Sequence, residues 1–220
     1  MDERGWGRVA AVAGLLFAAM ILLRTLVVPV PPWVGGQAGV QRFFAEKHGL
    51  LGFGVFATGV IVVLGTFFFG GLRAFLVRQS TVTPANIMFG GWLIQGALAL
   101  ARHTFVAIPA LIPAAAPSSA VGLYTLASVM LGFVWFSALI ITAAVGLVPN
   151  RSGALPAWFS WLTLVAAVIF LLGGLAVSTP AGFFSRSGDF RWVVLYTYIG
   201  WSAIAALVLY QRVGAEAPGA

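Results

Sequence analysis

The chain has no cysteine and very few acidic residues, and both shortages exclude whole classes of chemistry. Without cysteine there is no disulfide, no thiolate nucleophile and no thiolate metal site. The five acidic residues all lie near the termini or between apolar runs: Asp2, Glu3, Glu46, Asp189 and Glu216. No carboxylate therefore lies within an apolar run, where a transporter would bind a coupling proton or sodium ion. The single lysine, Lys47, lies at the edge of a run, which excludes a retinal Schiff base.

Charge of either sign is scarce. Charged residues make up 8% of the chain and hydrophobic residues 61%, whereas about a quarter of a soluble domain is charged. The net charge of +7 comes from basic residues scattered between apolar runs. This scatter is typical of membrane flanks rather than of a nucleic-acid-binding face. We therefore expect the lipid bilayer, and no nucleic acid, as a partner.

Six apolar runs fill the 220 residues. Each is long enough to cross roughly 30 Å of hydrocarbon as a helix that rises ~1.5 Å per residue. The predicted spans are residues 9–29, 49–71, 87–108, 121–148, 157–178 and 192–211. Proline and glycine lie between them, and no linker is long enough to separate two domains. The sequence predicts an all-α, single-domain bundle of six transmembrane helices over residues 1–220.

The first run is preceded by Arg4 and Arg8, as in a signal peptide, but no small-x-small cleavage site follows it. We therefore expect an uncleaved first span. With both termini cytoplasmic, the inner side would hold Arg4, Arg8, Arg73, Arg78, Arg151 and Arg212. The outer loops would hold Arg42, Lys47, Arg186 and Arg191. The inner side thus holds six basic residues and the outer loops hold four, which favours cytoplasmic termini.

Three ionisable residues lie within the predicted spans, and each is a candidate site because such groups are costly in lipid: Arg24, Arg102 and His103. All three are expected toward the outer side. In the third span Gly91, Gln95, Ala99 and Arg102 recur at helical spacing on one face, with His103 at its edge. We expect this face to pack on other helices, with Gln95 donating or accepting a hydrogen bond across the contact.

Three interpretations of these basic residues remain open. Arg24 and Arg102 could extend to the outer headgroups. They could instead form, with His103, an outward-open anion site to which the first outer loop contributes. The expected loop contributors are Arg42, Lys47 and His48, with Glu46 and Asp189 as nearby acids. In the third interpretation, Glu46 forms an ion pair with Arg24 or Arg42.

The segment 40–48 is predicted to be a short interfacial helix that could cap the outer mouth. Phe43 and Phe44 would face lipid, and the charged residues Arg42, Glu46 and Lys47 would face water.

The sequence has no His-Glu-x-x-His motif, no Gly-x-Ser-x-Gly motif and no phosphate-binding glycine loop. We therefore expect an accessory or ligand-binding membrane protein with no catalytic residue, metal or cofactor. Alternatives are a facilitator or channel for a small anion or anionic lipid, and a haem protein or enzyme using His48 and His103. Helix rise separates these histidines by about 8 to 10 Å in depth, which is poor for two axial ligands of one haem. A hydrolase would need Asp189 with Ser185 or Ser187.

Small residues and tryptophans add two further expectations. Ala10, Gly14 and Ala18 share one face of the first span, which could dock a helix of a partner protein. Five tryptophans lie at predicted span ends, where indole rings favour the membrane interface: Trp6, Trp33, Trp158, Trp161 and Trp192. Two lie near the middle of spans and could line a cavity or face lipid: Trp135 and Trp201.

Three stretches carry a resemblance to a known family. They are residues 40–49, Gly70-Gly71-Leu72-Arg73, and Gly153-Ala154-Leu155-Pro156-Ala157-Trp158. In these the chain resembles a family of small six-helix integral membrane proteins of unknown function, common in high-GC bacteria. The resemblance implies a compact helical bundle in the bacterial cytoplasmic membrane, and it assigns no functional residue.

Overall fold

The computed structural model describes residues 3–29, 36–79, 81–111, 119–148, 153–175, 178–179, 182–185 and 188–215. These residues form six helices and no strand: α1 (Glu3–Val27), α2 (Gly36–Arg78), α3 (Val82–Leu111), α4 (Ser119–Gly146), α5 (Ala157–Gly174) and α6 (Phe190–Ala215). Every helix contains a stretch long and apolar enough to cross a membrane. The prediction of an all-α chain with six such helices is confirmed.

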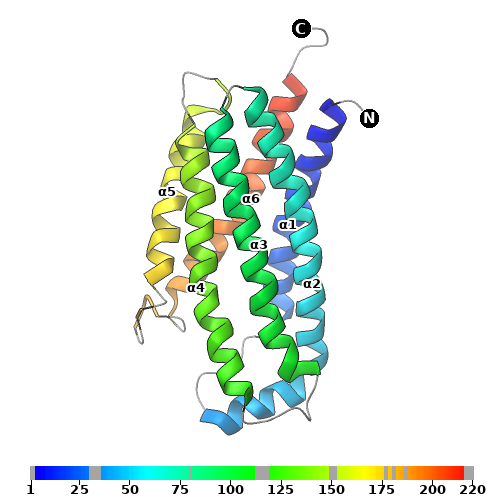
Figure 1. Ribbon diagram of the computed structural model, residues 1–220, viewed down its shortest axis with the longest axis vertical. Helices are drawn as coiled ribbons and strands as arrows, with labels where there is room; N and C mark the ends of the chain where they lie inside the picture. Colours follow the sequence, from blue (N-terminus) through cyan, green and yellow to red (C-terminus); the bar gives the residue numbers. More distant parts are fainter. Residues whose placement is uncertain are drawn as a thin grey trace.

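The helices run along the long axis of an elongated bundle, and both termini lie at the same end (Figure 1). Each helix packs on its neighbours in sequence, and α1 also packs on α6. The six helices therefore close into a ring around one interior. We refer to the end opposite the termini as the far end.

Helix α2 begins at Gly36, well before the predicted span start at residue 49. Its first part, residues 36–48, lies across the far end of the bundle (Figure 1). The expectation that Phe44 faces lipid is wrong, because its buried ring lies 6.3 Å from that of Tyr124 on α4. The charged residues Arg42, Glu46 and Lys47 are exposed, as expected of an amphipathic helix. The segment thus covers the far end with its apolar side.

Aromatic rings fill the interior between α1, α2, α3 and α6. Phe17 lies edge-on to Trp92 and Tyr198, with ring centroids 5.6 and 5.9 Å apart. Trp201 is buried, and its indole N–H donates to the Thr163 hydroxyl at 3.0 Å. This bond satisfies the polar atom that a buried tryptophan carries. Trp201 therefore belongs to the core and does not face lipid.

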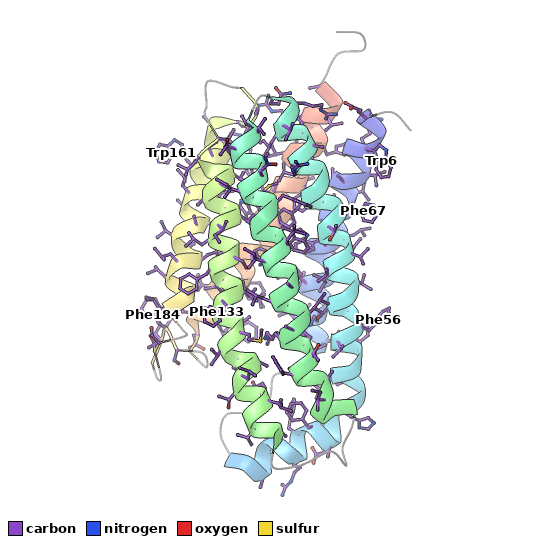
Figure 2. The ribbon with its side chains drawn as sticks, viewed as in Figure 1. Trp6, Phe56, Phe67, Phe133, Trp161 and Phe184 are labelled. Atoms are coloured by element: carbon purple, nitrogen blue, oxygen red, sulfur yellow. The ribbon has the colours of Figure 1, made fainter. Side chains whose placement is uncertain are left out.

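The outer surface of the bundle is apolar. Phe56, Phe67, Phe133 and Phe184 point outward from it (Figure 2), and Phe56 is 67% exposed. Three of the predicted interfacial tryptophans are also exposed: Trp6, Trp158 and Trp161. Trp33 lies outside the described residues. A continuous apolar surface of this kind fits contact with lipid better than contact with water.

The small-residue face of α1 packs inside the chain. Ala10 and Ala18 are buried, and a Cβ atom added to Gly14 would lie 2.6 Å from the Phe68 ring and 2.8 Å from Ala206. The small side chains thus let α2 and α6 approach α1 closely. A partner helix could use this face only if α2 or α6 moved away.

We expect Gly14→Ala to destabilise the bundle by about 1–3 kcal/mol, since the added methyl overpacks a site closed by the Phe68 ring. Gly59→Ala is the matched control, because a Cβ there meets no atom within 4 Å. The control should be neutral or slightly stabilising, as alanine favours a helix over glycine. Thermal unfolding of both variants in one detergent, followed by circular dichroism, measures the difference. Equal midpoints would contradict the packing described for α1.

Candidate functional site

Two arginines from different helices meet on one histidine near the far end. His103 Nε2 on α3 lies 2.5 Å from Arg24 Nη2 of α1 and 3.2 Å from Arg102 Nη1. His103 Nδ1 lies 2.7 Å from the Ala99 carbonyl oxygen. A guanidinium can only donate and a carbonyl can only accept, so Nδ1 carries the hydrogen and Nε2 accepts. The imidazole is therefore neutral and holds the two cations side by side.

Backbone carbonyls of two further helices anchor the arginines. Arg24 Nε donates to Gly54 of α2 at 3.3 Å, and Arg102 Nε donates to Ala127 of α4 at 3.1 Å. Each guanidinium has five N–H groups, so three on each arginine have no acceptor among the described residues. Both side chains turn into the bundle, so the interpretation that they extend to the headgroups is wrong.

A cavity of about 190 Å³ lies beside this cluster. Arg24, Arg102 and His103 line it together with Arg191, which lies in the first turn of α6. Arg191 Cζ lies 4.9 Å from the centre of the Trp192 ring, and its Nε is buried with no hydrogen-bond partner among the described residues. We call this the cationic cavity.

Among the residues that the structure describes, no acidic residue lines the cationic cavity. Its other polar or aromatic lining residues are Thr25, Tyr124, Ser128, Trp135 and Trp192. Glu46 and Asp189 are exposed, and among the described residues neither Arg24 nor Arg42 forms an ion pair with Glu46. The ion-pair interpretation is therefore wrong. Three arginines thus line the cationic cavity with no counter-charge from the described residues of its lining, which is costly unless an anion or water enters.

A second cavity of about 110 Å³ adjoins the first. The two share several lining residues, among them Arg24, Arg102, His103, Leu131 and Trp135. Most of the remaining wall is apolar, so we call it the apolar cavity. In its wall the Tyr198 hydroxyl donates to Gln95 Oε1 at 2.9 Å. The expected hydrogen bond of Gln95 across a helix contact is confirmed.

Several residues predicted for the site lie elsewhere. Arg42, Glu46, Lys47 and His48 are exposed and line neither cavity. The reason is the orientation of residues 36–48: the side that carries Phe44 packs on the bundle, so the charged side turns away. The expectation that the first outer loop joins the site is therefore wrong.

The arrangement gives no support to a haem held by two histidines. Both ring nitrogens of His103 have partners, and His48, whose Nδ1 lies 3.0 Å from the Ala45 carbonyl, lies outside the cavity. A haem would have to displace two arginines from His103. For the hydrolase alternative, the Ser185 hydroxyl donates to the Gly182 carbonyl at 2.7 Å, and Ser187 lies outside the described residues.

Sequence reasoning missed two residues of the site and left a third open. Arg191 was expected to be an ordinary flanking charge and Trp192 an interfacial ring, yet both line the cationic cavity. Trp135 is buried and lines both cavities, so it lines a cavity and does not face lipid. The one available signal for Arg191 was its position beside a tryptophan at a span end.

Comparison with known proteins adds no identification to this geometry. No protein family, curated protein or solved structure matches the chain. The resemblance to small six-helix membrane proteins stays a prediction.

Proposed function

We propose that the chain is a multi-pass protein of the bacterial cytoplasmic membrane with both termini in the cytoplasm. Six apolar helices and an apolar outer surface support this proposal. The basic residues Arg8, Arg73, Arg78 and Arg212 belong to helix ends on the side of the termini, as the positive-inside rule requires.

A reporter joined after Ala220 tests the orientation. We expect green fluorescent protein at this position to fluoresce and alkaline phosphatase to stay inactive, because the phosphatase needs the oxidising outer side. The same phosphatase inserted in the loop between α3 and α4 serves as the positive control. Active phosphatase after Ala220 would contradict cytoplasmic termini.

We further propose that the cationic cavity binds a small anion. The observation that carries this proposal is the set of three arginines, from α1, α3 and α6, that line one cavity whose described lining residues include no carboxylate. Arginine suits this role because its planar fork of N–H groups can donate two parallel hydrogen bonds to a carboxylate or phosphate. His103 and the backbone carbonyls hold the forks in place before any ligand arrives.

The geometry favours a binding protein over a channel. The apolar cavity meets the rings of Phe17, Trp92 and Tyr198, which pack edge to face. Beyond them Phe69 stacks on Trp92, with centroids 4.7 Å apart. An anion could cross the bundle only if these rings moved apart.

Titration of the purified protein with sodium acetate in a non-ionic detergent tests the proposal. We expect saturable binding at one site, because a single cavity holds the three cations. Tetramethylammonium, which has the opposite charge, should give no signal. Absence of binding of acetate and of every longer carboxylate, or equal binding of the cation, would refute an anion site.

A further inference from the structure

The apolar cavity adjoins the proposed anion site and shares lining residues with it, and this adjacency indicates what kind of anion fits. We infer that the ligand is a carboxylate with a single unbranched apolar tail of about four to eight carbons. This inference rests on the proposed function, since it takes the cationic cavity as the place of the charged group. The apolar tail of the ligand then occupies the apolar cavity.

The carboxylate end is placed by charge. Arg24 and Arg102 form part of the wall of both cavities, so they lie where the two cavities adjoin. On each of these two arginines, three N–H groups have no acceptor among the described residues. A carboxylate between them and Arg191 would accept several of these hydrogens and supply the missing negative charge.

The tail is placed by the chemistry of the inner wall. Ile61, Val62, Leu131 and Val134 line the apolar cavity, and the Tyr198 hydroxyl in its wall donates to Gln95 Oε1. Most of this wall therefore offers contact to hydrocarbon. A free phosphate ion would leave this space empty.

The length of the tail is limited by volume. An apolar cavity of about 150 Å³ in a protein interior holds one benzene molecule, which has six carbons. The apolar cavity measures about 110 Å³ and the cationic cavity about 190 Å³. Four to six carbons fill the first, and the second holds the carboxylate with the few carbons next to it. A lipid with two long acyl chains is too large.

A chain-length series tests the inference. The purified protein in a non-ionic detergent is titrated with acetate, butyrate, hexanoate, octanoate and dodecanoate. We expect the affinity to rise about threefold to fourfold per methylene up to about octanoate, and then to stop rising.

Two variants narrow the apolar cavity: Ala99→Leu adds three carbons to its wall, and Gly96→Ala adds one methyl. The methyl is tolerated, since a Cβ at Gly96 lies 3.7 Å from the nearest atom, Val62 Cγ1.

The variants separate cavity binding from partition into the detergent, because partition is the same for every variant. We expect Ala99→Leu to lower octanoate affinity at least tenfold and Gly96→Ala to lower it about threefold, with acetate affinity unchanged in Gly96→Ala. If Ala99→Leu does not fold, Gly96→Ala decides. Two results would overturn the claim that a tail occupies the apolar cavity, while leaving the anion site intact. One is equal affinity of the wild type for all chain lengths, and the other is equal octanoate affinity of the wild type and Gly96→Ala. No binding of any carboxylate would refute the anion site itself.

A lipid headgroup is the other possible source of the negative charge. Nanodiscs of phosphatidylglycerol and of phosphatidylcholine distinguish the two sources. We expect the same octanoate affinity in both, since the tail of the ligand and not a diacyl lipid fits the cavities. Loss of octanoate binding in phosphatidylglycerol would show that the headgroup occupies the site and would overturn the inference.

Discussion

Replacing Arg102 by glutamine lowers acetate affinity by about ten- to a hundredfold, because it removes a charge-assisted hydrogen bond of roughly 1.5–3 kcal/mol. Glutamine can still donate to the Ala127 carbonyl, which Arg102 contacts at 3.1 Å, so the helix contact is kept. Arg24→Gln should have an effect of the same size, since Arg24 lines the same wall. The affinities come from titration of each purified variant in the detergent used for the wild type.

Arg42→Gln is the matched control for these two variants. It removes the same charge from the same end of the bundle, but Arg42 is exposed and lines neither cavity. A surface charge is screened by salt, so we expect a change of less than twofold at about 0.15 M salt. If Arg42→Gln weakens binding as much as Arg102→Gln, general attraction to a basic surface explains the binding better than a built site does.

The second large effect is on stability and concerns His103. Leucine at this position removes the acceptor shared by Arg24 and Arg102 and leaves their N–H groups and charges with less compensation. We expect His103→Leu to lower the free energy of unfolding by about 2–4 kcal/mol. His103→Gln should lose less than half of that, because the glutamine oxygen can accept from an arginine in place of Nε2. Unfolding in a series of denaturing detergent mixtures measures both variants.

His48→Leu provides the control, since His48 is exposed and its ring contacts the Ala45 carbonyl of its own helix. A surface change of this kind is usually worth less than about 0.5 kcal/mol. Saturating acetate should also restore part of the stability of His103→Leu, because a bound anion stabilises the folded state. Equal losses in the leucine and glutamine variants would show that His103 contributes by packing and not as an acceptor.

The sequence allowed the helices and one helix face to be predicted well. Runs of apolar residues of membrane length are a strong signal, and each of the six predicted spans overlaps one observed helix, although the first, fourth and fifth run two to four residues past the end of the helix. The face of α3 that carries Gly91, Gln95 and His103 is buried, because polar and small residues at helical spacing are rare in such helices and mark the side turned to other helices. The same helical spacing predicts Arg102 on this face, and Arg102 lines the cationic cavity.

Rotation of the other helices could not be predicted in the same way. Where nearly every residue is apolar, no periodic signal tells the inner side of a helix from the lipid side. The sequence therefore predicts that Arg191 and Trp192 at the start of α6 are flanking residues, whereas both line the cationic cavity. The same problem affected α2, whose first part packs Phe44 inward against a surface that α4 supplies. Tertiary contacts decide these positions, and local sequence does not contain them.

The most direct test of the anion site is an experimental structure of the protein with bromide, a small anion whose anomalous signal locates it. We predict a bromide peak inside the cationic cavity, within hydrogen-bonding distance of Arg24 and Arg102 and close to Arg191. An empty cavity, with the arginine side chains extended to the membrane surface, would refute the site.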